Sequence, residues 1–322
     1  MKVYVVGAGA VGTYLGQALA ATGAEVAYAP RRLEDVVHVP ADLAIVAVKA
    51  YDTTGAIETL RRALGASSDT SIMTPQNGVG NEERLAAAFG ADRIISAALT
   101  VPVVRTTQGA VATSKRGGMG LAPVGSIAHN WLVAAFDATS IPVKVVADYR
   151  ALKWSKLELN IIANAACAIL NVLPARLVRL EHTFGLEIRA VREARAVMAA
   201  LRLHTVDLPR YPIRALQGIV KLPIPVAKVV LAARIAGARG RKPPSLLLDL
   251  QAAKGRTEVD VLNGAVAAVA RDLGVPAPVN STYARVLADI AHMPQLWAKY
   301  RERPAALLAE VEAEEARMGL RP

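Results

Sequence analysis

A glycine-rich turn directly behind the first apolar run constrains the fold of this chain more than any other feature. Residues 2–6 (KVYVV) are apolar and largely β-branched, which favours a buried strand, and the segment GAGAVG follows at 7–12. An apolar helical pattern then runs to about residue 22, and residues 25–29 (EVAYA) predict a second strand. This order of strand, glycine turn, helix and strand is the context in which GxGxxG binds a dinucleotide.

Each glycine of the turn has a physical task in that interpretation. Gly7 permits the tight turn, Gly9 lets a pyrophosphate approach the backbone, and Gly12 allows close packing of helix on strand. The N-terminus of the helix adds free N–H groups and partial positive charge. A tight turn without a ligand is the alternative. The residues predicted to contact the cofactor here are Gly7, Ala8, Gly9, Ala10, Val11 and Gly12.

The end of the second predicted strand indicates which dinucleotide is bound. An NAD enzyme usually places Asp or Glu there to bind the ribose 2′-hydroxyl, whereas this chain has Ala29 and Pro30 followed by Arg31 and Arg32. A guanidinium binds a 2′-phosphate through paired hydrogen bonds. The sequence therefore predicts NADP(H) as the cofactor, with Arg31 at the phosphate. A solvated arginine pair in a turn is the alternative.

Strand and helix signals alternate through the first half of the chain and then give way to helices alone. Further strands are predicted at 43–48, 71–74, 93–101 and 143–146, and helices at 54–64, 81–89 and 126–138. Residues 101–122 have short strands around glycine turns, which is an antiparallel hairpin pattern. The alternation predicts an α/β fold with a Rossmann-type doubly wound sheet. Because 322 residues suggest two domains and the strand signals stop near residue 148, we predict an NADP-binding domain over 1–148 and an all-α domain over 149–322.

Composition and residue spacing argue against disulfide-linked, membrane-spanning and metal-binding classes of protein. The single cysteine, Cys167, allows no internal disulfide and indicates a reducing compartment. The uncharged run 159–175 is short for a membrane span and carries three asparagines and a proline, so we expect a cytoplasmic protein without a membrane helix. The five histidines are dispersed and neither HExxH nor CxxC occurs, so no metal site is predicted.

The net charge of +11, from 38 Lys and Arg against 27 Asp and Glu, has several explanations. The basic residues are scattered and not interleaved with aromatic residues, so nucleic acid is not predicted as a partner. A small anionic substrate or cofactor uses the charge better. An arginine-rich genome explains it equally well.

The helical half contains polar residues that an apolar helix does not need. Lys156, Asn160 and Asn164 recur at intervals of four, which predicts one helical face, among leucines and isoleucines. We interpret this stripe as a polar wall; capping or bridging of neighbouring elements is the alternative. Two further polar candidates lie close together in the sequence, Ser245 in PSLLLD and Glu258 in RTEVDVLNG.

Taken in order, these segments resemble the ketopantoate reductase (2-dehydropantoate 2-reductase) family. The resemblance covers the chain from GAGAVG to about residue 290 and includes AVKAYDT at 47–53, QNGVG at 76–80, KLELNIIAN at 156–164, and the two segments at 244–249 and 256–264. It implies a helical domain of the 6-phosphogluconate dehydrogenase C-terminal type. It also implies NADPH-dependent reduction of 2-dehydropantoate to pantoate, a step of pantothenate and coenzyme A biosynthesis, with a homodimer among the states it allows.

The resemblance also implies roles for single residues. Lys156 would be the general acid, and Glu258 would support catalysis and substrate orientation. Asn160, Asn164 and Ser245 would contact the substrate, and Lys49 and Asn77 would line the junction of nicotinamide and substrate. A reductase of another 2-oxo acid and a non-catalytic NADP-binding relative are the alternatives.

Three departures from the family pattern bear on substrate and cofactor. The segment between Arg32 and Leu43 is short, one residue is inserted between Asp249 and Glu258, and Pro174 stands where some members have an asparagine that contacts substrate.

Overall fold

The computed structural model describes residues 1–65, 69–106, 110–113, 117–126, 129–180, 182–239 and 242–320. The chain forms two compact units, one of Met1–Lys156 with Thr205–Pro212 and one of Leu157–His204 with Ile213–Pro322. The division falls within helix α5 (Tyr149–Ile161), after the predicted domain boundary at residue 148. The first turns of α5 belong to the first unit because Lys153 bonds to Gln76 and the Ser155 hydroxyl accepts from Val206 N at 2.9 Å.

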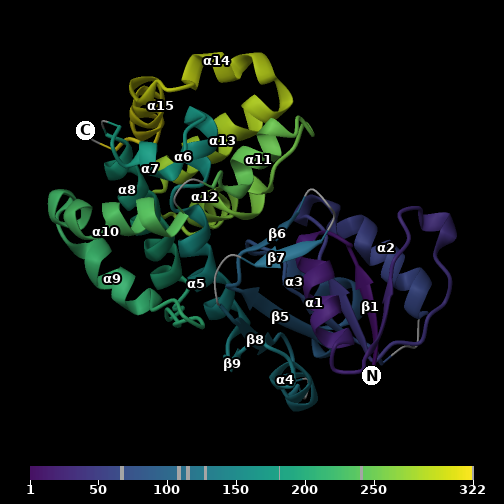
Figure 1. Ribbon diagram of the computed structural model, residues 1–322. Helices are drawn as coiled ribbons and strands as arrows, with labels where there is room; N and C mark the ends of the chain where they lie inside the picture. Colours follow the sequence, from purple (N-terminus) through teal and green to yellow (C-terminus); the bar gives the residue numbers. More distant parts are fainter. Residues whose placement is uncertain are drawn as a thin grey trace. The chain divides into compact units, whose positions relative to one another are not determined.

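The first unit contains a seven-stranded sheet in the order β2-β1-β3-β4-β5-β8-β9 (Figure 1). Neighbouring strands are parallel, apart from β8, which pairs antiparallel with β5. The prediction of a doubly wound, mostly parallel sheet is therefore confirmed. The strands are β1 (Lys2–Val6), β2 (Glu25–Tyr28), β3 (Leu43–Val46), β4 (Ser71–Thr74), β5 (Ile94–Leu99), β8 (Met119–Pro123) and β9 (Val143–Val145).

Helices cover both faces of this sheet, so its central strands β3, β4 and β5 are buried along their whole length. On one face, Val5 and Ile45 pack with residues of α1 (Ala10–Ala20) and α4 (Asn130–Asp137). On the other, Tyr4 and Val46 pack with residues of α2 (Thr53–Leu64) and α3 (Asn81–Phe89). The carboxyl ends of the parallel strands are left to the loops, and loops at these ends carry the ligand sites of such folds.

Two predicted segments need separate description. The hairpin predicted within 101–122 is present as β6 (Val103–Arg105) paired with β7 (Val111–Thr113), while residues 107–109 and 114–116 of it lie outside the described residues. The short segment after Arg32 forms a single 3-10 turn, η1 (Leu33–Asp35), before β3. β3 then pairs directly with β1, so the shortening leaves the sheet order intact.

The second unit is built from helices over its described residues, as predicted. The last turn of α5 belongs to it. The other helices are α6 (Ala165–Leu170), α7 (Pro174–Leu177), α8 (Thr183–Ala200), α9 (Ile213–Lys221), α10 (Ile224–Arg239), α11 (Ser245–Gln251), α12 (Asn263–Asp272), α13 (Pro278–His292), α14 (Trp297–Tyr300) and α15 (Pro304–Arg317), with 3-10 turns η4 (Glu258–Val261) and η5 (Pro294–Leu296). Among the described helices, none is both long and apolar enough to cross a bilayer.

Candidate active site

The turn between β1 and α1 has the geometry that the glycines predict. Gly7 has φ +107°, and a Cβ there would lie 2.7 Å from Ala47 C and Val48 N. A Cβ on Gly12 would lie 2.0 Å from Gly7 O, so helix and strand approach too closely for any other residue. Around Gly9 the described atoms leave a Cβ position free to 4 Å. The backbone is therefore open where a pyrophosphate would approach.

A cavity of about 520 Å³ lies beside this turn, at the carboxyl ends of β1, β2 and β3. Gly7, Ala8, Ala29, Pro30 and Arg31 line it, so the glycine turn and the predicted phosphate ligand share one cavity. The residues present therefore fit a dinucleotide. A larger hollow of about 1260 Å³ opens at the amino ends of the strands, which is not where ligands of such sheets bind.

Three further charged residues line the 520 Å³ cavity, and the sequence interpretation missed them. Arg105 reaches it from β6, and Asp52 and Glu58 line it from the segment after β3. The charge of the cavity is thus mixed. The two arginines can bind a phosphate, whereas the two carboxylates can accept from hydroxyl groups. Arg105 lies in a hairpin that gave no cofactor signal in the sequence.

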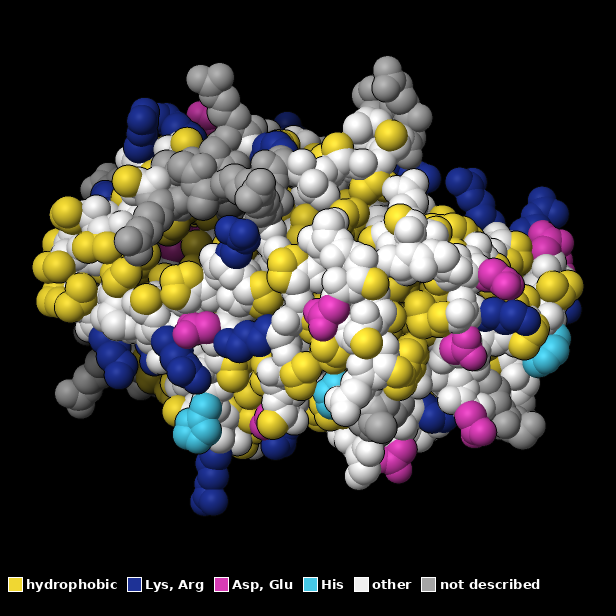
Figure 2. All heavy atoms as spheres, turned by 60° about the horizontal axis from the view of Figure 1, so that its bottom comes forward, with side chains coloured by type: hydrophobic (Ala, Val, Ile, Leu, Met, Phe, Trp, Pro, Cys, Tyr) yellow, Lys and Arg dark blue, Asp and Glu magenta, His cyan; other side chains and the backbone are white. Residues whose placement is uncertain are grey.

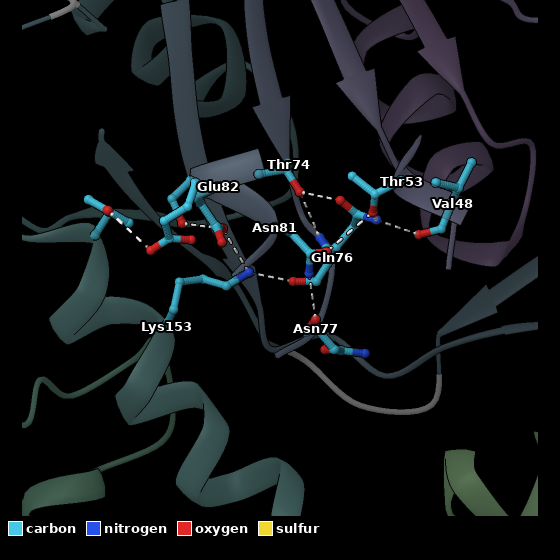
Figure 3. Close-up of polar contacts among 11 residues, drawn as sticks. Val48, Thr53, Thr74, Gln76, Asn77, Asn81, Glu82 and Lys153 are labelled. Carbon is cyan, nitrogen blue, oxygen red and sulfur yellow. Dashed lines mark hydrogen bonds and ion pairs between the residues drawn. The ribbon is translucent and has the colours of Figure 1, made fainter. Parts of the chain in front are cut away.

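The loops that carry Lys49 and Asn77 are tied together by the side chain of Gln76, which is buried (Figure 3). Its amide nitrogen donates to Val48 O at 3.1 Å and to Thr53 Oγ1 at 2.9 Å, and its amide oxygen accepts from Thr74 at 3.0 Å. Lys49 is half-buried and Asn77 is exposed. The structure thus brings together the two loops whose residues were predicted to act at one place.

A buried lysine that the sequence interpretation did not select completes this corner. Lys153 of α5 is 3% exposed, and its ammonium donates to Gln76 O and lies 3.0 Å from Glu82 Oε1 of α3 (Figure 3). Glu82 is 1% exposed and also accepts from Ser96 Oγ at 2.8 Å. The sequence offers one sign of this role: Lys153 stands between two large apolar residues, Leu152 and Trp154, which are both buried, one turn before Lys156.

Lys156 is half-buried on α5, with Asn160 one turn later on the same helix. The prediction that Asn164 continues this helical face is wrong. Helix α5 ends at Ile161, and Ala163 has φ +49°, in the left-handed region. The carboxylate of Glu187 accepts the Ala163 N–H, which holds the break, and α6 begins only after Asn164.

The side chain of Asn164 is 3% exposed and bonded to the protein on both ends of its amide. Its nitrogen donates to Asn160 O at 3.0 Å and to Ser245 Oγ at 3.3 Å, and its oxygen accepts from Leu246 N at 3.1 Å. Both N–H groups therefore have acceptors within the protein. The geometry matches the bridging alternative, and it leaves the exposed Ser245 at the start of α11 in a fixed place.

Glu258 begins the turn η4 and is 5% exposed. Thr257 caps this turn by accepting from Val259 N at 3.3 Å. The following Asn263 donates to Asn280 at 2.9 Å, and Asn280 in turn donates to Glu193 at 2.7 Å. The motif RTEVDVLNG thus places one buried carboxylate on a turn anchored to α13 and α8.

Two further expectations concern metal and cysteine chemistry. Within the described ranges, no group of three or more His, Cys, Asp or Glu side chains is arranged to hold a metal ion. Cys167 is a buried thiol in α6 and forms no disulfide. A thiol in that position packs as a small apolar side chain.

Comparison with known proteins points to a single family. Residues 27–126 match the family described as "Ketopantoate reductase PanE/ApbA", and residues 148–291 match "Ketopantoate reductase PanE/ApbA C terminal". A 2-dehydropantoate 2-reductase from Halobacterium salinarum is 31% identical over 264 residues, covering 79% of this chain and 76% of that protein.

Solved structures agree with this match. A PanE/ApbA family ketopantoate reductase from Ralstonia eutropha JMP134 superimposes with a TM-score of 0.75 at 28% identity, covering 92% of this chain and all of that one. A D-mandelate dehydrogenase in complex with NADH superimposes with a TM-score of 0.73 at 19% identity, covering 90% and 99% of the two chains. The second likeness concerns the fold alone.

Proposed function

The chain belongs to the ketopantoate reductase family and is an oxidoreductase that reduces 2-dehydropantoate, and from this premise we propose that it does so with NADPH. The single observation that carries the cofactor proposal is the cavity that Gly7, Ala8 and Arg31 line together. The glycine turn offers backbone N–H groups to the pyrophosphate. Arg31 and Arg105 offer guanidinium groups to a 2′-phosphate, which a carboxylate at the end of β2 would repel.

The dinucleotide, when bound, supplies a hydride to the carbonyl carbon of the 2-oxo acid. That transfer leaves negative charge on the carbonyl oxygen, which a positioned acid must protonate. We assign this proton to the ammonium of Lys156, which is half-buried on α5. Lys49 and Asn77, on loops joined through Gln76, would orient the nicotinamide and the reacting carbonyl.

The second unit would supply substrate contacts from the helical domain. The proposed contacts are Asn160 of α5, Ser245 of α11 and the carboxylate of Glu258. Asn164 would act mainly by holding Ser245, since both of its N–H groups are bonded to protein acceptors. We thus propose that residues 1–148 bind the cofactor, with Lys49 and Asn77 also facing the substrate, and that residues 149–322 supply the other substrate contacts and the catalytic groups. A homodimer in the cytoplasm remains our expectation for the whole protein.

A cofactor comparison with a matched pair of arginine variants tests the proposal. We expect kcat/KM with NADPH to exceed that with NADH by at least about tenfold, or roughly 1.4 kcal/mol. Arg31→Ala should remove most of this preference and leave the NADH kinetics nearly unchanged. The control is Arg32→Ala, because the neighbouring Arg32 is 77% exposed and lies 4.0 Å from Glu34. Equal use of both cofactors by the unaltered protein would overturn the proposal.

The same assay decides between 2-dehydropantoate and other 2-oxo acids. The inserted residue before Glu258 and Pro174 are the features that favour a different acid. Pro174 stands at the start of α7, where its side chain is buried. A panel of branched and aromatic 2-oxo acids at saturating NADPH should show the highest kcat/KM for 2-dehydropantoate. No turnover of any acid, with NADPH bound, would identify a non-catalytic relative.

A further inference from the structure

The backbone on both sides of Asn77 is held by side-chain donors. Gln76 O accepts from the ammonium of Lys153, and Asn77 O accepts from Asn81 Nδ2 at 3.2 Å (Figure 3). These two carbonyls belong to the peptide planes before and after the Asn77 Cα. Because each peptide unit is planar, fixing both carbonyls fixes the two soft dihedral angles of Asn77. The Cα–Cβ bond of its exposed side chain therefore leaves the backbone in a direction that these two bonds set.

Of the two donors, Lys153 is the unusual one. Asn81 is local, four residues away and at the start of α3, whereas Lys153 comes from another helix, 77 residues further along the chain. Its charge is almost fully removed from water and is balanced by Glu82 at 3.0 Å. Breaking a buried ion pair is costly, but an intact pair adds little stability over apolar side chains of similar volume. Stability alone is thus a weak reason for a lysine here.

The position of Lys153 on α5 gives it a second connection to the site. Lys156 follows three residues later, so the two lysines lie on adjacent turns of one helix. A bond from Lys153 to Gln76 O therefore fixes α5 against the loop that carries Asn77. The turn of α5 that carries the proposed acid and the loop that carries the proposed nicotinamide contact are joined by this bond, and both belong to the first unit.

We propose that Lys153 is a positioning residue for the reduction. Its bond to Gln76 O holds Asn77 in a fixed position relative to the turn of α5 that carries Lys156, and Glu82 balances its charge. This inference rests on the proposed function, because it takes Asn77 and Lys156 to act on the nicotinamide and the substrate. Lys153 itself touches neither ligand. Its removal therefore acts on the geometry of the reacting groups and leaves cofactor affinity in place.

Three variants separate positioning from stability. Lys153→Met removes the donor and leaves the Glu82 carboxylate buried and unpaired. Lys153→Met combined with Glu82→Gln removes both charges and keeps an acceptor for Ser96, so it should restore stability but not the bond to Gln76 O. Lys153→Arg keeps a cation. The control is Lys144→Met, because the exposed Lys144 also donates to a backbone carbonyl, Asp207 O, at 2.7 Å.

We expect Lys153→Met to lower both the melting temperature and kcat. The double variant should regain most of the melting temperature, yet kcat should stay about ten- to a hundredfold below that of the unaltered protein. The dissociation constant of NADPH should be unchanged in both. Lys153→Arg should recover part of kcat, and Lys144→Met should leave kcat unaltered. If kcat returns together with stability in the double variant, Lys153 is a structural residue and the proposal is wrong.

Hydrogen exchange gives a readout that needs no turnover. In both Lys153→Met proteins, the amides of residues 77–80 should exchange faster than in the unaltered protein, and those in Lys144→Met should not. Unchanged exchange there would overturn the proposal whatever the kinetics. If the unaltered protein reduces no 2-oxo acid, the proposed function fails, while the exchange rates still decide whether Lys153 holds the loop.

Discussion

Lys153 and Lys156 lie one turn apart on α5 and have different surroundings. Lys153 is 3% exposed, donates to Gln76 O and pairs with Glu82 within the protein. Lys156 is half-buried, so part of its side chain is accessible to solvent. A general acid has to exchange its proton with substrate and then with solvent. The contrast between the two lysines supports our proposal that Lys156 is the acid.

Removal of the Lys156 ammonium gives the first prediction at the residue scale. Lys156→Ala should lower kcat by on the order of 10²–10⁴ because the developing alkoxide loses its proton donor. NADPH should still bind with unaltered affinity, which fluorescence titration measures. Lys228→Ala, at an exposed position of α10, is the control for loss of a positive charge. Near-normal turnover by a folded Lys156→Ala protein would contradict the assignment.

The candidate residues that spacing alone predicted, without the family resemblance, are those whose chemistry is local. Gly7 and Gly12 are required by a strand–turn–helix segment within twelve residues, and Arg31 follows directly from the end of β2. Arg105 was missed because the other residues that line its cavity are distant in the chain, and Lys153 was missed because its partner Gln76 is distant. Periodicity and spacing cannot indicate that a lysine will meet a carbonyl 77 residues away.

The same limit applies at the scale of elements. The sheet and its helices were predictable because each strand and helix has its own periodic pattern. The end of α5 was not, because NIIANAACAIL continues an apolar helical pattern through the break. A carboxylate from α8 accepts the N–H of Ala163, and the Asn164 amide bonds to α11, so tertiary partners replace the helical ones. Helix α5 therefore ends where these tertiary hydrogen bonds take the place of the helical backbone bonds.

A carboxylate on α15 gives a prediction about how the C-terminal helices are joined. Glu310 accepts from Lys299 at 2.6 Å, from Arg285 at 2.7 Å and from Tyr300 at 3.1 Å, linking α15 to α14 and α13. Hydrogen bonds from Lys299 and then Arg285 lower the pKa of Glu310 from 4.5 to about 2. A lowered pKa of an acid in the folded state stabilises the protein above the unfolded pKa. This contribution is therefore lost as pH falls from about 4.5 to 2.

Glu310→Gln should accordingly destabilise the protein at neutral pH by on the order of 1–2 kcal/mol, allowing for solvent screening. The difference from the unaltered protein should shrink as pH falls through the same window, since both side chains are then neutral. Urea unfolding at several pH values measures it. Glu312→Gln, at an exposed position of the same helix, is the control. A difference that does not change with pH would mean that charge is not the cause.

At the scale of the whole molecule, the distribution of the basic residues bears on how the net charge of +11 is used. On the face drawn in Figure 2, Lys and Arg side chains stand at separated places with Asp and Glu among them. Nucleic-acid binders instead gather their basic residues along one face or helix. An anionic dinucleotide and a 2-oxo acid need only a few cations, and Arg31 and Arg105 at one cavity are enough for a phosphate.

The division of the chain into two units predicts where the cofactor stabilises it. Residues of the glycine turn, Arg31 and Arg105 all belong to the first unit. Saturating NADPH, at about 100 times its dissociation constant, should stabilise what it binds by about 2.7 kcal/mol. Hydrogen exchange should therefore slow at residues 7–13, 29–32 and 103–105, and NADH at equal saturation should protect 29–32 less. Unchanged exchange in α12 and α13 serves as the internal control. Protection confined to those helices would contradict the assignment of the cofactor to the N-terminal domain.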